Sequence, residues 1–301
     1  MTRGLNPSAT RPLLGLVPQL VRGLVGQRMT PKPTSTEIVF IPPLDEIAPA
    51  AAAFSLRRVR SAYTGPAIRV RRSSDNAEAD IGFTSAGNLN IAALLAHCGI
   101  GSGFDAFWYD QSGNGRHLTQ ATAGAQPRIV NAGVIDTLGG VPTLVFDAVD
   151  DFMTAASWGT ISQPFSHNAV ISTGASYPGF PGVVGTETGT PSTTTFIETN
   201  FAALVMNAGN NGPQAAIGFN ERAVFTSLYN GASSVIAKNG TASGTASPGS
   251  NGWEGARING GPGTFAGLRF QEVILFDSAL STQNRQLLER NQGAYYGITV
   301  A

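Results

Sequence analysis

Short stretches in which apolar and polar residues alternate recur along most of the chain. "AIRVRR" places Ile68 and Val70 on one face and arginines on the other, and "DAFWYD", "TLVFD", "AVFTSLY" and "SVIAK" alternate similarly. A period of two residues is typical of β-strands, because successive side chains point to opposite faces. The segment "FAGLRFQEVILFD" has the strongest strand pattern. The pattern therefore predicts a protein built mainly from short strands.

Asn-Gly dipeptides separate many of these stretches. They occur at 114–115, 230–231, 239–240, 251–252 and 259–260. Asn and Gly tolerate the positive φ that primed hairpin turns require. Many short strands joined by such turns favour an antiparallel sandwich or jelly roll. The chain has no repeat with a period of about 20 to 50 residues, which argues against solenoids and propellers.

Three segments have a helical pattern instead. Residues 51–63 follow an Ala-rich join, and "NLNIAALLAHCG" ends at a glycine. "LSTQNRQLLERNQGAYYG" offers Ser281 as N-cap, and we expect this helix to end at Gly293. The predicted fold class is therefore all-β, with a few short helices.

The first 50 residues differ from the rest of the chain. The apolar stretch 13–25 is interrupted by Pro18 and Arg22, so it is too short and too broken for a membrane span. No uninterrupted apolar core leads to the cleavage site of a secretory signal. We expect residues 1–50 to form an extended N-terminal arm without a core, and residues 51–301 to form one sandwich domain.

Charge and cysteine content exclude several classes of protein. The formal net charge is zero and only 13% of residues are charged, so the chain lacks the field with which nucleic-acid binders attract phosphates. Arginines cluster at 57–60 and 69–72, either as a solvated face or to bind an anionic polysaccharide or a neighbouring subunit. Cys98 is the only cysteine, which excludes an internal disulfide, and the three histidines lack metal-binding spacing.

The segment "FDAFWYDQSGNGRHLTQ", residues 104–120, carries the densest group of polar candidates. It has two interpretations: the rim of a sugar-binding site, or a tight turn whose polar side chains bond only to the backbone. Trp253 lies between two turns and is the aromatic residue that we expect to be exposed for stacking on a sugar ring. The candidate ligand-binding residues are Asp110, Asn114, Arg116, His117 and Trp253.

Three aspartates in "FDAVDDFM" form a candidate metal site. Asp147, Asp150 and Asp151 fall within five residues at the junction of two strands. Ca²⁺ prefers several oxygen ligands in flexible geometry, so it is the one cofactor that the sequence suggests. The alternative is that these carboxylates accept hydrogen bonds from the amides of a turn.

Carboxylates are also the groups that a glycosidase needs, as a pair roughly 5 to 10 Å apart across a cleft. No pattern in the sequence selects one pair over another, so no catalytic residue is assigned. The candidates in the second half of the chain are Glu187, Glu198, Glu221, Glu254, Glu272 and Asp277.

Several segments resemble known families. Five segments are similar to concanavalin A-like (laminin-G-like) domains of phage tail and other virion proteins: "YTGPAIRVRRSSDNAEADIGF", "LNIAALLAHCG", "FWYDQSGNGRHLTQATAGAQPRIVNAG", "GVPTLVFDAVDDFM" and "FQEVILFDSALSTQNRQLLERNQGAYYGI". That resemblance covers residues 54–298 and implies a jelly-roll β-sandwich. The first half also resembles the opening part of the catalytic domain of family 54 α-L-arabinofuranosidases, in which a Tyr-Asp-Gln-Ser-Gly-Asn-Gly segment likewise follows a strand. The second resemblance implies an enzyme only where that family's two carboxylates are also present.

The resemblance to phage proteins, together with the arm, favours a structural protein of the virion, located in a tail, a fibre or the capsid decoration. We expect its N-terminal arm to bind other virion proteins, and the loops of its lectin-like sandwich to bind cell-surface polysaccharide. We expect the protein to form a homo-oligomer in the particle. We expect no nucleic-acid partner and no membrane span. A role without catalysis is favoured over an enzyme. The alternatives are an arabinofuranosidase-like glycoside hydrolase and a decorating protein that binds no ligand.

Overall fold

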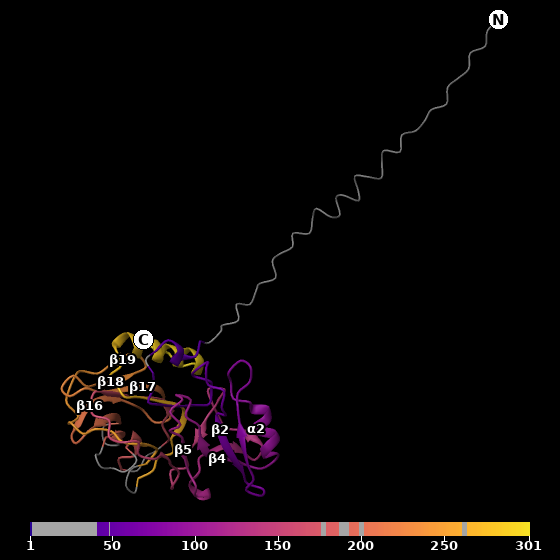
Figure 1. Cartoon of the computed structure of the whole chain (residues 1–301), viewed down its shortest axis with the longest axis horizontal. Helices are drawn as coiled ribbons and strands as arrows, with labels where there is room; N and C mark the ends of the chain where they lie inside the picture. The colour runs from indigo at the N-terminus through magenta and orange to yellow at the C-terminus, as the bar shows by residue number, and fades with distance from the viewer. Residues whose placement is uncertain (2–40, 48, 176–178, 187–192, 199–201, 261–263) are drawn as a thin grey trace. The chain divides into compact units, whose positions relative to one another are not determined.

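The structure is a computed structural model that describes residues 1, 41–47, 49–175, 179–186, 193–198, 202–260 and 264–301. The chain divides into two units, residues 1–39 and 40–301, and all helices and strands below belong to the second (Figure 1). Most of the expected arm thus lies outside the described residues. Its last residues belong to the folded unit: they form the short helix η1 (Pro43–Asp45), and Ile47 joins a buried cluster with Leu288.

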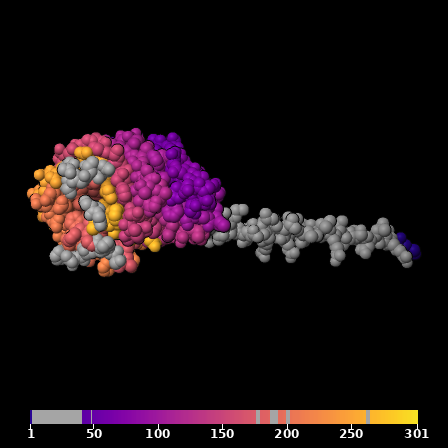
Figure 2. Space-filling view, turned by 90° about the horizontal axis from the view of Figure 1, so that it is seen from below, coloured from indigo at the N-terminus to yellow at the C-terminus, as the bar shows by residue number. Residues whose placement is uncertain are grey.

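Among the described residues, 19 strands form one continuous sheet whose pairings are all antiparallel. The core is one large cluster of buried apolar side chains contributed by both halves of this sheet. In the space-filling view, a purple surface from the first part of the folded unit lies at one end of it, and an orange surface from its second half lies at the other (Figure 2). The expectation of an all-β fold is confirmed at this level, while the jelly-roll connectivity stays a prediction.

One half of the sheet is centred on two long strands that pair with each other, β12 and β21. β21 lies where the sequence has its strongest strand pattern, as expected. Pairing runs in the order β1, β21, β12, β17, β18, β19. The bounds are β1 (Ala52–Ser55), β12 (Phe165–Ser172), β17 (Arg222–Tyr229), β18 (Val235–Lys238), β19 (Thr241–Ala242) and β21 (Arg269–Phe276).

The other half begins at β3 and continues through β2, β4, β5, β11, β20, β13, β14 and β15 to β16. The bounds are β2 (Ile68–Arg72), β3 (Glu78–Ile81), β4 (Gly103–Trp108), β5 (Leu118–Thr119), β11 (Met153–Ala155), β13 (Gly182–Gly185), β14 (Thr194–Glu198), β15 (Ala203–Asn207), β16 (Asn211–Ala216) and β20 (Ala256–Ile258).

Short strands connect the two halves. β6 pairs with β4 on one side and with β10 on the other, and β10 pairs with β21. The remaining elements are β6 (Arg128–Asn131), β7 (Val134–Ile135), β8 (Thr137–Leu138), β9 (Val141–Pro142), β10 (Leu144–Val145) and the short helix η2 (Ala123–Ala125). No helix in the described part of the chain is long and apolar enough to cross a membrane.

The helix α3 (Thr282–Tyr296) packs against the sheet half that contains β12 and β17. Every residue of β12 is buried, because alternate side chains face the core and the helix. Asn168 on the helix-facing side donates to the Gln292 side chain at 3.1 Å, whereas Ala169 belongs to the central core. A strand covered on both faces does not need the simple apolar-polar alternation that marks a half-exposed strand.

The ends of the helices follow the expected cap chemistry with one exception. The Ser281 side chain accepts a hydrogen bond from the amide of Asn284, as predicted, and α2 (Ile91–Cys98) lies within the predicted segment. Gly293 does not end α3, which continues to a left-handed Gly297. A Cβ at Gly293 would lie 2.6 Å from Val300 Cγ2, so this glycine permits close packing of the chain end rather than a helix stop.

The helix expected over residues 51–63 is not formed. Residues 52–55 form β1 instead, with Ala52 opposite Leu275 of β21. Alanine has the highest intrinsic helix propensity, but propensity contributes less than about 1 kcal/mol per residue, and complete burial of Ala52, Ala53 and Phe54 against the sheet outweighs it. The hairpin at Asn239-Gly240 is confirmed, since both residues have positive φ, 49° and 88°, between β18 and β19.

A buried ion pair fixes β1 against β21. Both side chains of Arg57 and Glu272 are almost fully buried, and Arg57 Nε donates to Glu272 Oε2 at 2.8 Å. Burial alone would raise the pKa of Glu272, but the Arg57 guanidinium outweighs it and the pKa lies below its usual value. Ser55, Gln292 and Tyr296 also donate to this carboxylate. Its oxygens are therefore fully used in holding the fold together.

Candidate functional site

The loop after β4 contains four of the candidate ligand-binding residues, and the structure brings all four together. Asp110 is buried, and its two carboxylate oxygens accept from the amides of Ala53, Ser112 and Arg116. The Ser112 hydroxyl donates to the same carboxylate at 2.8 Å. Asp110 therefore closes its own turn and attaches that turn to β1.

The neighbouring side chains attach the same loop to the same segment. Asn114 Nδ2 donates to the carbonyl of Ala51 at 3.0 Å, and an Arg116 guanidinium nitrogen donates to that carbonyl at 3.1 Å. His117 Nδ1 accepts from the amide of Asp110. These contacts give the loop a structural role. A second role as a ligand rim stays a prediction.

Trp253 is not exposed, and the expectation that it offers a free stacking face is wrong. It has no accessible surface and packs edge-on against Trp158, with ring centroids 5.3 Å apart. Trp253 also packs against the fully buried His167 at 4.9 Å. The two turns that flank Trp253 in the sequence misled the prediction, because the residue itself bridges to Ile161 through backbone hydrogen bonds inside the fold.

Trp158 links this buried cluster to the loop after β4. The Arg116 guanidinium lies 4.7 Å from the centre of a Trp158 ring, a distance suited to a cation–π contact. Arg116 and Trp253 therefore both contact Trp158. The predicted ligand-binding set is one contiguous region, but its members are used in packing.

The three aspartates of the candidate metal site also lie together, in a turn between β10 and β11. One carboxylate oxygen from each of Asp147, Asp150 and Asp151 lies within 4.8 Å of the others. We call residues 147–151 the acidic turn. Asp147 Oδ1 accepts from the amides of Val149 and Asp150, and Asp151 Oδ2 accepts from the amide of Asp147. The Asp150 side chain is exposed and makes no hydrogen bond within the described part of the chain.

Asp151 differs from its neighbours because it is only 4% exposed. Burial raises its pKa to about 7, and the nearby carboxylates of Asp147 and Asp150 contribute in the same direction. A hydrogen bond from the Asp147 amide and the positive charge of Arg128 act against that rise. Near neutral pH the acidic turn therefore combines a carboxyl group that retains a proton with exposed carboxylates beside it.

Apolar and aromatic side chains surround the acidic turn. Phe152 packs against Phe265 with ring centroids 6.1 Å apart, and the Arg257 guanidinium lies 4.1 Å from the centre of the Phe152 ring. Val149, in the turn itself, is 70% exposed. Charged groups beside apolar faces suit a carbohydrate, whose rings present both hydroxyls and C–H surfaces.

The acidic turn also suits a cation in part. After the amide contacts, one oxygen of Asp147, one of Asp151 and both of Asp150 are available as ligands in the described structure. These hard oxygen donors fit Ca²⁺, but a complete shell needs six to eight oxygens. Calcium binding stays a proposal for these residues.

The other carboxylates named from the sequence are less suitable. Glu272 is consumed by the ion pair with Arg57, and Glu221 pairs with Lys238 at 2.5 Å. Glu254 accepts from the Thr160 hydroxyl, and Glu198 is buried at the end of β14. Asp277 is exposed after β21, and Glu187 lies outside the described residues.

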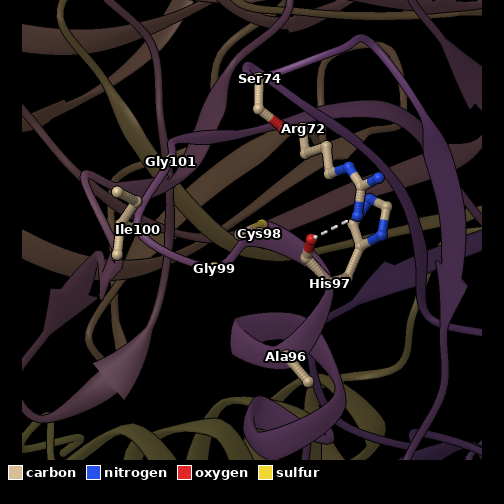
Figure 3. Close-up of a pocket in the computed structure, with 8 residues that line it drawn as sticks. All are labelled: Arg72, Ser74, Ala96, His97, Cys98, Gly99, Ile100 and Gly101. Atoms are coloured by element: carbon tan, nitrogen blue, oxygen red, sulfur yellow. Dashed lines mark hydrogen bonds between the residues drawn. The ribbon is translucent and has the colours of Figure 1, made fainter.

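A cavity of about 310 Å³ lies at the C-terminal end of α2 (Figure 3). An Arg72 guanidinium nitrogen donates to the carbonyl of His97 there, and Arg72 also pairs with Asp75. Cys98 contributes a buried thiol whose pKa burial raises, so it is a poor nucleophile. The cavity is lined by Arg72, Ser74, Ala96, His97, Cys98, Gly99, Ile100 and Gly101, and this set offers no carboxylate for acid–base chemistry.

Comparison with known proteins identifies one family in the first half of the chain. Residues 45–143 match the family model described as "Alpha-L-arabinofuranosidase B, catalytic". The chain is 47% identical over 74 residues to the alpha-L-arabinofuranosidase of Hypocrea jecorina, and 46% identical over 75 residues to a probable alpha-L-arabinofuranosidase B of Aspergillus fumigatus. The matched part resembles an arabinofuranosidase. The alignments with these two relatives cover 25% of this chain and 15% of each relative.

Solved structures extend the likeness to most of the fold. An arabinofuranosidase complexed with arabinofuranosyl-alpha-1,2-xylobiose superposes on 83% of this chain and 64% of its own, with a TM-score of 0.61 and 19% identity. A GH54 arabinofuranosidase soaked with a cyclic sulfate inhibitor gives the same TM-score at 18% identity. At this low sequence identity, the superposition shows a shared fold only. The comparisons support the partial resemblance to family 54 and not the resemblance to phage domains.

These findings correct the functional expectations. The prediction of a virion structural protein is wrong, because the family model, the two relatives and the two superposed structures named above are all described as arabinofuranosidases. The expected virion location, the partners in a particle and the preference for a protein without catalysis are overturned by the same findings. Neither an arm without a core nor the lack of a recognisable carboxylate pair in the sequence excludes an enzyme.

The surroundings of the acidic turn are not evident in the sequence. Phe152 and Phe265 are 113 positions apart in the numbering and meet only because β11 pairs with β20. Asn259, which was noted only as part of an Asn-Gly turn, contacts the acidic turn directly: its Nδ2 donates to the carbonyl of Asp151 at 2.9 Å. No pattern in the sequence indicates this contact, because it arises from the pairing of β11 with β20.

Proposed function

We propose that this protein is a glycoside hydrolase that releases α-L-arabinofuranosyl groups. The observation that carries the proposal is the match of residues 45–143 to an arabinofuranosidase catalytic domain, and the fold shared with solved arabinofuranosidases supports it. The match ends at residue 143, four positions before the acidic turn, so the reacting residues are assigned from the geometry of this chain.

The acidic turn supplies the two carboxyl groups that glycoside hydrolysis requires. Asp151, with a pKa of about 7, is mostly protonated below neutral pH and serves as the proton donor to the glycosidic oxygen. The exposed carboxylate of Asp150 attacks the anomeric carbon as the bond to the leaving group breaks. Water then releases the sugar from Asp150, and Asp151, now ionised, takes the proton of that water.

The spacing of the carboxylates predicts the stereochemical outcome. One oxygen of each carboxyl group lies within 4.8 Å of the other, closer than the roughly 6.5 to 9.5 Å of inverting enzymes, and this favours a retaining mechanism. Asp147 is less suited to attack, because two amides already bind one of its oxygens. The first product is therefore expected to retain the α configuration, which proton NMR of a running reaction measures.

Two substrates with different leaving groups test the roles separately. With 4-nitrophenyl α-L-arabinofuranoside the leaving group departs without help, whereas arabinofuranosyl-α-1,2-xylobiose needs protonation. Asp151→Asn should lower kcat on the second substrate by roughly 100- to 10,000-fold and affect the first much less. Asp150→Asn should abolish turnover of both.

Asp277→Asn serves as the matched control, because Asp277 is an exposed aspartate outside the acidic turn. Its kinetics should equal those of the wild type on both substrates. The proposal fails if the wild-type protein turns over neither substrate. The assignment of the two roles fails if Asp151→Asn and Asp277→Asn behave alike.

A second candidate for the same residues is a Ca²⁺ site, favoured by the three carboxylate oxygens within 4.8 Å. Bound Ca²⁺ would hold Asp151 ionised and so remove its ability to donate a proton. The two functions are therefore alternatives. Calorimetric titration with Ca²⁺ distinguishes them: binding that Asp150→Asn removes would support the metal site, and inhibition by Ca²⁺ would show that the two compete.

A further inference from the structure

Asn259 occupies an unusual position beside the acidic turn. It lies directly after β20, is fully buried and has a φ of 52°, in the left-handed region that asparagine tolerates better than most residues. Its Nδ2 donates to the carbonyl of Asp151 at 2.9 Å and to the carbonyl of Ala266 at 3.0 Å. Its Oδ1 accepts from the amide of Ala266. One side chain therefore joins two segments that are more than one hundred positions apart.

Further contacts show that the segment held by Asn259 lies against the acidic turn. A Cβ built on Gly267 would come 3.7 Å from the Ala148 Cβ, and the Phe265 ring packs against that of Phe152. The backbone amide of Asn259 donates to the carbonyl of Val183 in β13. Asn259 is thus the point at which β13, the acidic turn and residues 264–267 meet.

We propose that Asn259 is a positioning residue that holds the main chain of Asp151 so that its carboxyl group faces the exposed carboxylate of Asp150. This inference rests on the proposed function. Aspartate has a short side chain, so the position of its carboxyl group follows that of its backbone closely. Loss of the bond from Asn259 frees the Asp151 carbonyl and allows the acidic turn to move away from residues 264–267.

The charged groups that face Asp151 are known, so a change in its titration can be interpreted. Asp147 and Asp150 act from the same turn, and Arg128 acts from β6. Arg128 is held by an ion pair with Asp136 at 2.8 Å and does not depend on Asn259. Movement of the acidic turn would therefore change the burial of Asp151 while these charges remain in place.

A pair of Asn→Gly substitutions tests the proposal. Glycine adopts positive φ without strain, so Asn259→Gly removes the side-chain bonds and keeps the backbone conformation. Asn239→Gly is the matched control: Asn239 has a φ of 49° and its Oδ1 accepts from the amide of Val224, in the hairpin between β18 and β19. If Asn259→Gly does not fold, Asn259→Asp replaces it, because aspartate tolerates the same φ but lacks the donor to Asp151.

Two measurements are made on the full chain: kcat and KM for arabinofuranosyl-α-1,2-xylobiose, and titration of the Asp151 carboxyl carbon by NMR. Asn259→Gly should lower kcat on the order of 100-fold with little change in KM, the effect expected of a misplaced catalytic group. The Asp151 titration should move toward lower pH as the carboxyl group gains access to water. Asn239→Gly should leave both quantities at their wild-type values.

The inference is overturned if Asn259→Gly and Asn239→Gly give the same kcat and the same Asp151 titration while the wild type is active. Lack of turnover by the wild type would instead overturn the proposed function, and with it any catalytic part for Asn259. An equal loss of kcat on 4-nitrophenyl α-L-arabinofuranoside also contradicts the inference, because positioning of the proton donor matters little for that leaving group.

Discussion

The loop at residues 110–117 and the acidic turn at residues 147–151 are both turns built on aspartates that accept backbone amides. In the loop, the amides of Ala53, Ser112 and Arg116 and the Ser112 hydroxyl share the oxygens of Asp110. In the acidic turn, Asp150 keeps both of its oxygens free of hydrogen bonds in the described structure, and Asp151 keeps its proton to about pH 7. The loop lies in the part of the chain that matches the arabinofuranosidase family, and the acidic turn lies beyond it.

The difference shows that a dense group of polar residues does not by itself indicate a functional site. The two turns differ in how many carboxylate oxygens remain without a hydrogen bond once the backbone amides have been bound. A carboxylate whose lone pairs are all used by buried amides contributes to stability, because each of those amides would otherwise be buried without a partner. A carboxylate with unused oxygens at the surface remains available for a substrate or an ion.

The largest expected effect is on the loop. Asp110→Ala removes the acceptor for three amides and a hydroxyl, so we expect the free energy of unfolding to fall by about 4 kcal/mol or more. Urea titration followed by circular dichroism measures this loss. A loss below about 1 kcal/mol would contradict the structural role of the loop.

A smaller effect is expected on the pH dependence of stability, through Asp151. Its pKa is about 7 in the folded protein and near 3.8 when unfolded, so the unfolded chain loses this proton first as pH rises. Stability from this group is complete below about pH 4 and falls as pH increases to about 7, by at most about 4 kcal/mol over the whole range. The Asp151→Asn variant should not show this decrease in stability with pH, although its asparagine side chain can still accept the hydrogen bond from the Asp147 amide.

The comparison is made by urea titration of both proteins at several pH values. The difference in unfolding free energy between Asp151→Asn and the wild type should grow between pH 4 and pH 7 and remain constant above that. Parallel curves would show that Asp151 is ionised in the folded state, and the contrast between the two turns would no longer hold.

Arg116→Ala should have an intermediate effect on stability. The substitution removes one hydrogen bond to the Ala51 carbonyl and the contact with the Trp158 ring, which together are worth about 1 kcal/mol. Thermal unfolding measures the change. A decrease in activity without a decrease in stability would instead favour the role of this loop as a ligand rim.

The smallest stability effect is expected for Asp150→Asn. Asp150 is exposed, so the unfolding free energy should change by less than about 0.5 kcal/mol even though turnover is lost. Circular dichroism and urea titration, made on the protein used for kinetics, show whether stability and activity separate. A large loss of stability would mean that Asp150 supports the turn, as Asp110 supports its loop.

Local patterns in the sequence were enough to predict much of the fold. The pattern in residues 265–277 predicts β21, and Ser281 is correctly assigned as the N-cap of α3. Residues 51–63 were assigned incorrectly, because their state depends on pairing with β21 more than two hundred positions away. Trp253 was placed at the surface for the same reason, since its burial depends on Trp158 and His167.

The candidate site could be predicted only in part. The three clustered aspartates are evident in the sequence, but the burial that separates Asp151 from Asp150 is a property of the folded chain. The contact between Asn259 and Asp151 likewise arises from the pairing of β11 with β20. The family resemblance was recognised from the loop at residues 110–117, although that loop does not contain the reacting groups that we propose.

The most direct test of the central claim is the kcat of wild-type protein and of Asp151→Asn for arabinofuranosyl-α-1,2-xylobiose, measured by release of free arabinose. We predict turnover by the wild type and a loss of roughly 100-fold or more in the variant. Equal rates of arabinose release by the two proteins, or no release by the wild type, would contradict the account.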